Sequence, residues 1–205
     1  MALSRSEQSD NPIVILINDE NLKVYLNLAY SYEAEFSSLT HKMPNEFGIF
    51  EPDTMPKSPY TGYLLYLKNI PIGFCIAKIS EEINDIAEFY VIPAMRKNKF
   101  GCNFAISIFD THPGKWQVRE IAGADNAIAF WRKVITKFTN NEYKEAVVND
   151  PTWGIVTRQQ FVSGAKKKFL SSSEILPCYR IFPPPSSDTE RKEIKDDKAS
   201  KSYVL

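Results

Sequence analysis

Residues 86–101, with the sequence IAEFYVIPAMRKNKFG, place the strongest constraint on how this chain can fold. An apolar, strand-like run ends at Pro93, a basic loop follows, and a glycine opens an amphipathic helix. The first N–H groups of a helix have no intrahelical acceptor and lie at the positive end of its dipole, so such a turn favours an anion. Arg96, Lys97 and Lys99 exceed what one carboxylate needs, which favours phosphate or pyrophosphate. A plain solvated turn is the alternative, and the loop matches neither the P-loop nor the GxGxxG fingerprint.

The strands on either side of this loop predict the sheet. Three strand-like runs joined by short turns come before it, at residues 60–67, 70–80 and 85–93, and they predict an antiparallel meander. A helix over residues 101–111 and a strand over residues 115–121 come after it. Because that helix crosses over between them, the strand at 115–121 should lie parallel to the strand that ends at Pro93. One face of this later strand carries Trp116, Val118 and Glu120.

Further elements extend the same domain at both ends. The remaining predicted elements are a strand at 13–17, helices at 22–39 and 126–138, and strands at 142–148 and 153–161. We therefore predict a single α/β domain over residues 12–163, with a mixed, mostly antiparallel sheet flanked by helices. Residues 1–11 are expected to be disordered. Residues 164–205 form a low-complexity C-terminal tail, in which residues 175–182 are apolar enough to dock as an extended strand.

Composition argues against several classes of function. A net charge of zero over 205 residues gives no global field for nucleic acid or a membrane surface, so neither is expected as a partner. The N-terminal residues are polar and no apolar run reaches about 18 residues, so neither a signal peptide nor a membrane span is expected. Cys75, Cys102 and Cys178 are widely spaced and odd in number, which predicts reduced thiols and a cytoplasmic location. The sequence has two histidines, His41 and His112, and no cluster of Cys and His, so no metal site is expected.

Three segments occur in the order found in one enzyme family. EFYVIPAMRKNKFGCNFAISIFD, PGKWQVRE and AIAFWRKVI together resemble the GNAT superfamily of N-acetyltransferases, and more narrowly its bacterial branch with EFFV, PGxWQV and FWRKVI-like motifs. The resemblance covers roughly residues 13–162. It implies a GNAT-like domain with a splayed central strand pair, and transfer of an acetyl group from acetyl-CoA to a primary amine by direct attack in a ternary complex. A non-catalytic GNAT-like protein that binds acyl-CoA, or that acts through its C-terminal tail, is the alternative.

The resemblance also implies which residues hold coenzyme A. In the family, the loop after the fourth strand follows R-x-x-G-x-G/A, and its backbone amides bind the pyrophosphate. The matching loop here comprises Arg96, Lys97, Asn98, Lys99, Phe100, Gly101 and Cys102. Lys99 replaces the middle glycine of the motif. Its β-carbon would restrict the approach of a phosphate whereas its ammonium would attract one, so weakened or altered binding is expected.

Further coenzyme contacts follow from the same resemblance. Backbone groups of Tyr90, Val91 and Ile92 in the splayed strand would hold the pantetheine arm, and the Val91 N–H is the expected oxyanion donor. In many relatives a tyrosine in the helix after the fifth strand is the general acid, and Trp131 stands at that position here. Indole is no acid at neutral pH, so Trp131 would pack against the pantetheine or line the acceptor pocket, or else belong to the core. Asn126 is the candidate for the family's asparagine contact, displaced by two residues.

Acetyl transfer to an amine needs a base for the amine proton, a donor for the oxyanion and an acid for the thiolate. Glu88 lies in an apolar run just before the expected thioester position, where burial would raise its pKa, so it is the first candidate base. Asp85 is the second, and in a regular strand it would point to the opposite face. A structural role for Glu88, as partner of a buried amide or of Arg119, is the alternative. Tyr90, Tyr143 or water would supply the acid.

The segment 41–59 is expected to be a long irregular loop, because prolines recur along it. Long loops in compact domains are often functional, and this one could shape the acceptor site. Glu46, Glu51 and Asp53 would then recognise a cationic acceptor, whereas a solvated loop is the alternative. The acceptor is expected to be a small-molecule or peptide amine, such as a polyamine, an aminoglycoside or a lysine-bearing peptide. A homodimer is left open.

Overall fold

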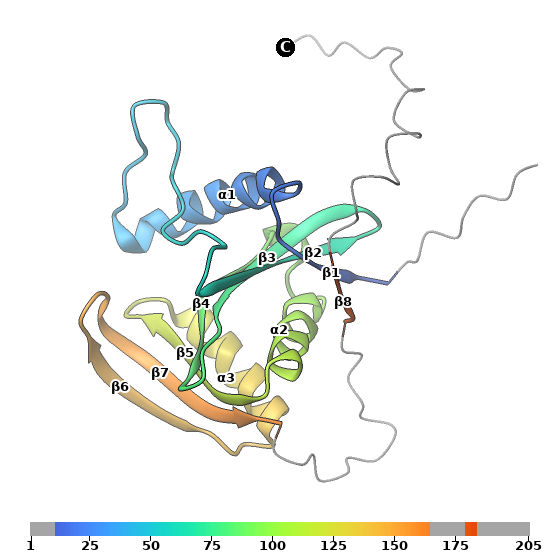
Figure 1. Ribbon diagram of the computed structural model, residues 1–205. Helices are drawn as coiled ribbons and strands as arrows, with labels where there is room; N and C mark the ends of the chain where they lie inside the picture. Colours follow the sequence, from blue (N-terminus) through green and yellow to red (C-terminus); the bar gives the residue numbers. More distant parts are fainter. Residues whose placement is uncertain (1–10, 165–178, 184–205) are drawn as a thin grey trace, which may run out of the picture.

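One mixed sheet organises the part of the chain that the computed structural model describes, which is residues 11–164 and 179–183 (Figure 1). The strand order in these residues is β6-β7-β5-β4-β3-β2-β1-β8. The strands are β1 (Ile13–Leu16), β2 (Tyr60–Leu67), β3 (Ile70–Lys78), β4 (Asn84–Val91), β5 (Gly114–Ile121), β6 (Lys144–Asp150), β7 (Gly154–Ser163) and β8 (Ile181–Phe182). Two neighbouring pairs, β4 with β5 and β1 with β8, are parallel, and the other pairs are antiparallel. The predicted single α/β domain with a mixed, mostly antiparallel sheet is confirmed.

Helices cover both faces of the sheet. The helices are α1 (Leu22–Thr40), α2 (Phe100–Thr111) and α3 (Asp125–Thr139), and a short 3-10 turn spans Pro93–Met95. Figure 1 shows α1 on one face and α2 with α3 on the other. The alternation of side chains along the strands feeds two separate cores. Leu64 and Phe74 pack under α1 with Tyr25, whereas Tyr63 and Cys75 face α2 and α3.

The β4 and β5 strands are joined by α2, and they part near their C-terminal ends. Their parallel pairing runs over three residue pairs and ends at Ile86 with Val118. The strands themselves continue to Val91 and Ile121. The crossover and the splayed central strand pair expected from the sequence are therefore present. The backbone groups of β4 beyond this point have no partner strand on that side, so those that no side chain engages are available to a ligand.

A β-bulge in β4 changes which side chains share a face. Ala77 pairs with Ile86 but Ile76 pairs with Glu88, so Ala87 is an extra residue in the ladder. A bulge of this kind shifts the alternation by one position. Asp85 and Glu88 therefore lie on the same face of the sheet, the face that α1 covers. The expectation that Asp85 points to the opposite face from Glu88 is wrong, because it assumed a regular strand.

The C-terminal part of the chain contributes a short edge strand. Ile181–Phe182 form β8, which pairs with Val14 and Ile15 of β1. The sheet thus includes two residues beyond the predicted domain boundary at 163. The last two residues of the predicted docking segment 175–182 do form a strand, and residues 175–178 lie outside the described residues. Residues 1–10 of the segment predicted to be disordered, and residues 165–178 and 184–205 of the predicted tail, also lie outside the described residues.

Gly73 offers a test of how closely β3 and β4 pack. A Cβ at Gly73 would lie 2.4 Å from the carbonyl oxygen of Tyr90, whereas a Cβ at Gly48 would meet nothing within 4 Å. We expect Gly73→Ala to lower the free energy of unfolding by about 1–3 kcal/mol, because backbone atoms must shift to relieve the clash. The matched variant Gly48→Ala should cost about 1 kcal/mol, from its positive φ alone. Urea unfolding of both measures the difference, and equal losses would contradict this packing.

Candidate functional site

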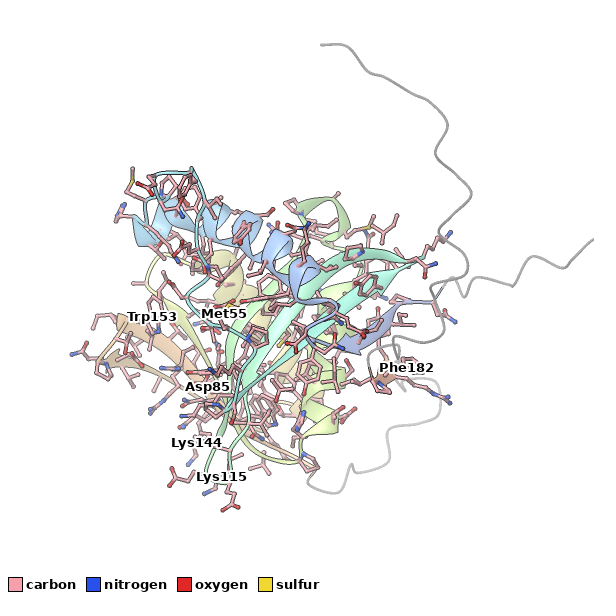
Figure 2. The ribbon with its side chains drawn as sticks, turned by 45° about the horizontal axis from the view of Figure 1, so that its top comes forward. Met55, Asp85, Lys115, Lys144, Trp153 and Phe182 are labelled. Atoms are coloured by element: carbon pink, nitrogen blue, oxygen red, sulfur yellow. The ribbon has the colours of Figure 1, made fainter. Side chains whose placement is uncertain are left out.

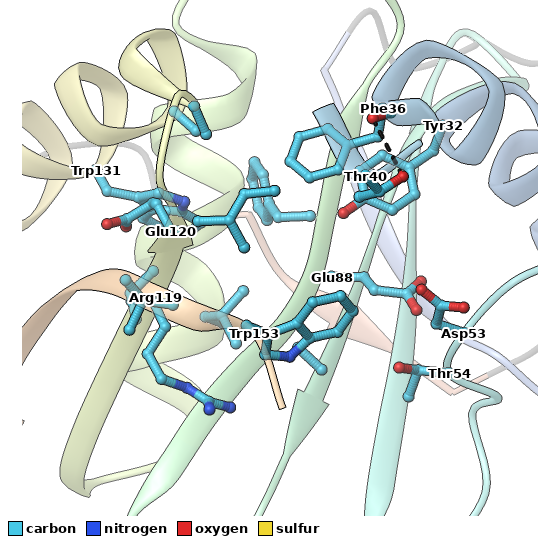
Figure 3. A pocket seen from close by; sticks show the side chains of 18 of the residues that line it. Tyr32, Phe36, Thr40, Asp53, Thr54, Glu88, Arg119, Glu120, Trp131 and Trp153 are labelled. Atoms are coloured by element: carbon cyan, nitrogen blue, oxygen red, sulfur yellow. Dashed lines mark hydrogen bonds between the residues drawn. The ribbon is translucent and has the colours of Figure 1, made fainter. Parts of the chain in front are cut away.

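A cavity of about 140 Å³ lies where β4 and β5 part (Figure 3). Its wall is built from α1, the loop 41–59, β4, β5, α3 and the turn between β6 and β7. The polar and aromatic side chains that line it include Tyr32, Glu33, Phe36, Asp53, Thr54, Glu88, Arg119, Glu120, Trp131 and Trp153. Figure 3 shows Glu88 and Asp53 on one side of the cavity and Glu120 with Trp131 on the other. The parting of the two strands thus creates both the space and its polar lining.

Glu88 is buried in this cavity, with 5% of its surface exposed. The Tyr25 hydroxyl donates to Glu88 Oε2 over 3.3 Å, and Glu88 Oε1 has no hydrogen-bond partner in the described residues. Burial raises the pKa of this carboxyl to about 7, the Glu33 carboxylate adds to the rise, and Thr54 and Tyr25 lower it in part. Glu88 therefore sits where the sequence placed the candidate base, with a free oxygen and a pKa suited to proton transfer near neutrality.

Asp85 lies outside the cavity lining and is engaged by other groups. Its Oδ2 accepts from Arg119 over 2.5 Å and from Gln117 over 3.0 Å. Arg119 also pairs with Asp150 over 2.5 Å. The Arg119 guanidinium is thus held by two aspartates. It does not pair with Glu88, as the alternative interpretation of Glu88 had suggested. Burial raises the pKa of Asp85, and Arg119 opposes this effect.

The two candidate tyrosine acids are not part of the cavity lining. Tyr90 faces α1, where its ring packs against Phe74 and Tyr32 and lies 5.5 Å beneath the Arg96 guanidinium. Tyr143 directly precedes β6, whose first residue, Lys144, pairs with Gln160. Gln160 is itself level with Gln117, in the region where β4 and β5 are still paired. Figure 2 shows Lys144 near Lys115, at the end of the molecule away from Trp153.

The direction of β6 therefore places Tyr143 away from the cavity. The β6 strand runs antiparallel to β7, so it starts at the end of the sheet opposite the splay. The side chain of Tyr143 instead packs against the core under α2 and α3.

The loop between β4 and α2 is pinned by its first cation. The Arg96 Nε donates to the Val91 carbonyl over 2.8 Å, and its two terminal nitrogens donate to the Glu35 carboxylate over 2.7 and 2.8 Å. Glu35 lies on α1, so this contact joins the loop to the opposite layer. Arg96 thus already has a carboxylate partner, whereas Lys97 and Lys99 carry the loop's exposed positive charge.

Lys99 occupies the helix-capping position of α2 with a φ of +65°, in the left-handed region. Its side chain makes no capping hydrogen bond, and its carbonyl accepts from the Asn103 N–H. The first N–H groups of α2, from Phe100 to Cys102, therefore have no intrahelical acceptor. The backbone adopts the conformation that glycine favours even though the residue is lysine. This geometry fits an anion at the helix start, in the loop where the sequence predicts one.

The backbone of β4 presents alternate groups to the gap. The Ile92 N–H donates to the Ile72 carbonyl over 2.9 Å, so in an antiparallel ladder the groups of Val91 and Phe89 point away from β3. They face the space left by β5. The Val91 carbonyl is taken by Arg96, which leaves the Val91 N–H as the expected oxyanion donor. The Ile92 N–H is committed to the sheet, so this predicted pantetheine donor is not available.

Three further candidates have distinct positions. Trp131 is buried, lines the cavity and packs edge-on against Phe89 with ring centroids 5.0 Å apart, so it is both core and cavity wall. Asn126 is exposed in the first turn of α3 and does not line the cavity. Cys102 is half-buried in the first turn of α2, where burial raises the pKa of its thiol.

The loop 41–59 contributes one acidic side chain to the cavity. Asp53 lines it, whereas Glu46 and Glu51 do not. The Lys42 ammonium pairs with Asp53 over 2.6 Å and with Glu33 of α1 over 3.0 Å, so it ties the loop to the helix. Of the three carboxylates expected to recognise a cationic acceptor, Asp53 alone lines the cavity, and it is paired with Lys42.

Sequence reasoning missed Glu120. Its side chain is 4% exposed and lines the cavity, and neither carboxylate oxygen has a hydrogen-bond partner in the described residues. Burial raises its pKa to about 8, with a further contribution from the Glu145 carboxylate. A signal was present in the alternation of β5, because Glu120 shares a face with Trp116 and Val118. A carboxylate on an otherwise buried face is a candidate for function.

Known proteins establish the fold. No family model and no curated protein matches the sequence. Among solved structures, the ribosomal-protein-S18-alanine N-acetyltransferase from Escherichia coli is 12% identical, with a TM-score of 0.50 over 78% of this chain and 100% of that one. An acetyltransferase from Thermus thermophilus is 13% identical, with a TM-score of 0.54 over 74% and 96%. AAC(6')-Ib in complex with paromomycin and acetyl-CoA is 13% identical, with a TM-score of 0.55 over 80% and 99%.

The chain therefore has the fold of these acetyltransferases, and the GNAT-like domain expected from the sequence is confirmed at the level of the fold. In the described residues, no helix is long and apolar enough to cross a membrane. The same residues contain no group of three or more His, Cys, Asp or Glu side chains that could hold a metal ion.

Lys99 offers a test of the backbone at the start of α2. Replacing it by glycine should raise the free energy of unfolding by about 1 kcal/mol, because glycine adopts the left-handed region without the cost of a β-carbon. The control Lys23→Gly removes an exposed lysine inside α1 and should instead lower stability by about 1 kcal/mol. Thermal or urea unfolding compares the two, and a loss of stability in Lys99→Gly would contradict the assigned conformation.

Glu88 makes stability depend on pH in a defined direction. Its folded-state pKa of about 7 lies above the ordinary value of 4.5, so the folded chain holds this proton more tightly than the unfolded chain. The stabilising contribution is complete below the unfolded pKa and is lost as pH rises through about 7. Glu88→Gln should therefore be more stable than wild type at about pH 8.5, by up to about 3 kcal/mol, with little advantage at about pH 4. Unfolding at both pH values measures this, with exposed Glu82→Gln as the neutral control.

Proposed function

We propose that this protein is an acyl-CoA-dependent N-acyltransferase that moves an acetyl group from acetyl-CoA to a primary amine by direct attack. The observation that carries the proposal is Glu88, a buried carboxylate with a free oxygen and a pKa of about 7 at the splayed end of β4 and β5. A group with that pKa is largely available as a base near neutral pH, so it can accept the proton that the attacking amine loses. The likeness in fold to acetyltransferases supports the same reaction.

The start of α2 is the proposed diphosphate site. The free N–H groups of residues 100–102 and the cations Lys97 and Lys99 would hold the pyrophosphate of coenzyme A. Arg96 acts through the backbone, because its guanidinium holds the Val91 carbonyl and Glu35. Acetyl-CoA supplies the activated acetyl group, and the pantetheine arm would extend along the open edge of β4 toward Val91.

The residues at the parting of the strands then supply the chemistry. Glu88 accepts the proton of the attacking amine, and the Val91 N–H stabilises the oxyanion that forms on the thioester carbonyl. Tyr32, Phe36 and Trp153 give the acceptor site an aromatic wall, and Asp53 adds a carboxylate. These groups suit a cationic small molecule or a peptide amine. The free thiols of Cys75 and Cys102 fit a reducing compartment, and we place the protein in the cytoplasm.

A non-catalytic GNAT-like protein is the second candidate. Three features favour it: the engagement of Arg96 with Glu35, the lysine at position 99, and Trp131 at the position of a tyrosine acid. Such a protein would bind acyl-CoA weakly or act through its tail, and would release no thiol. The assignment to the bacterial branch with EFFV, PGxWQV and FWRKVI-like motifs stays a proposal based on the quoted segments.

Turnover separates the two candidates. Purified protein with acetyl-CoA should release free thiol with at least one member of a panel of spermidine, kanamycin and a lysine-bearing peptide. Glu88→Gln should lower kcat by about 10²–10⁴-fold, because the base is lost, while acetyl-CoA binding measured by calorimetry persists. Glu82→Gln is the matched control, since it removes an exposed carboxylate from the β3–β4 turn. Thiol release at background level with the whole panel would favour the non-catalytic protein.

A further inference from the structure

Glu120 faces the same cavity as Glu88 but comes from the other strand. The β4 strand supplies Glu88 and the β5 strand supplies Glu120, on either side of the point where the two strands part. Figure 3 shows Glu120 on the α3 side, with Trp131, and Glu88 across the cavity. A thioester placed between the strands, as proposed above, would lie between the two carboxyl groups.

The surroundings of Glu120 give its carboxyl no charged partner of its own. The cation near it is Arg132 of α3, whose guanidinium donates to the Glu145 carboxylate of β6 over 2.6 and 2.8 Å. Gln159 of β7 donates to Glu145 over 3.1 Å, and both Arg132 and the Gln159 side chain lower the pKa of Glu120 in part. Glu145 and Arg132 therefore neutralise each other. Among the described residues, both oxygens of Glu120 are left without a hydrogen-bond partner.

A carboxyl group in that position is more stable with its proton than without it. An ionised carboxylate that is buried without a partner carries a large desolvation cost, whereas the neutral acid does not. The raised pKa of Glu120, about 8, agrees with this geometry. At neutral pH the wall beside Trp131 therefore holds a carboxylic acid, which can donate a proton.

We propose that Glu120 is the general acid that protonates the departing coenzyme A thiolate. The inference rests on the proposed acyl transfer. It fills a gap in the site, because Tyr90 and Tyr143 do not line the cavity and the indole of Trp131 cannot supply a proton. Trp131 instead walls off the carboxyl group and keeps it in a dry environment.

The proton balance is complete within the site. Glu88 removes one proton from the attacking amine, and the C–N bond forms as the thioester carbonyl becomes an oxyanion. The oxyanion collapses, the C–S bond breaks, and Glu120 transfers its proton to the leaving sulfur. Glu120 is then ionised and Glu88 is protonated. The proton of Glu88 returns to Glu120 through solvent after the products leave, so the net reaction moves one proton from amine to thiol.

The pH profile of kcat tests the two roles separately. Glu88 must be ionised and Glu120 protonated, so kcat should rise through about pH 7 and fall above about pH 8. Glu120→Gln should lower kcat by about 10²-fold at the optimum and abolish the alkaline fall, with little change in KM for acetyl-CoA. Glu120→Asp keeps a carboxylic acid one methylene farther away and should retain the alkaline fall at reduced kcat. The acceptor is whichever of spermidine, kanamycin and the lysine-bearing peptide releases most thiol.

Glu145→Gln is a matched control in the same polar cluster. It removes the neighbouring negative charge and frees Arg132, so the pKa of Glu120 should fall. The alkaline fall of kcat should then move to lower pH without being lost. A structural role for Glu120 would not produce this shift.

A titration that does not depend on turnover tests the proposal even if the Glu120 variants fail to fold. Carbon-13 NMR of the side-chain carboxyl groups should show one glutamate of wild type titrating near pH 8, shifted in Glu145→Gln. The proposal is overturned if no carboxyl of wild type titrates above about pH 7.5, or if Glu120→Gln keeps both kcat and the alkaline fall. Wild type that releases no thiol with any acceptor refutes the proposed function itself, and Glu120 as its acid fails with it.

Discussion

The loss of pairing between β4 and β5 is the constraint on which the rest of the site depends. While the strands are paired, their backbone groups satisfy each other and no ligand can enter. After Ile86 and Val118 the ladder ends, and the bulge at Ala87 accompanies the parting by bending β4. The helices α1 and α3 lie over opposite faces of the opened sheet, so the space between the strands stays shielded. A shielded space with free backbone amides is the setting in which a carboxyl pKa rises and an oxyanion is stabilised.

Most of the fold could be predicted from the sequence because its signals are local. Apolar alternation, Gly and Pro punctuation and helix starts identified the ten elements up to residue 163, and the single crossover helix identified the parallel pair. The bulge could not be found this way, since it is a mismatch between two strands and neither strand records it alone. The sequence therefore assigned Asp85 and Glu88 to opposite faces. The pairing of β6 with β7 is likewise a property of two strands, and it places Tyr143 away from the cavity.

The sequence predicted where the candidate site lies better than it predicted which side chains pair with one another there. Residue types and spacing located Glu88 and the basic loop, because both lie next to a recognisable strand end. They could not show that Arg96 is paired with Glu35, which is 61 positions away. Arg96 was expected to bind a ligand, but its guanidinium binds a carboxylate of the same chain. Lys97 and Lys99 are therefore the cations of the loop that remain for a phosphate. Lys99 illustrates the opposite case, since its backbone adopts a conformation suited to glycine although the residue is lysine.

The buried carboxylates of the described residues fall into two groups. Glu33 is paired with Lys42 and Asp85 with Arg119, so these two acids serve the packing of α1 and β5. Within the described part of the chain, Glu88 and Glu120 have no such cation: one oxygen of Glu88 and both oxygens of Glu120 lack a hydrogen-bond partner, and no ion pair compensates for their burial. Their burial makes the folded chain less stable as pH rises, because each must either keep its proton or be ionised in a dry place. A chain that only needed to fold would gain by replacing both with apolar residues. Both carboxyl groups instead occur in one cavity, on the two strands that part. Such a departure from good packing is expected at a catalytic site.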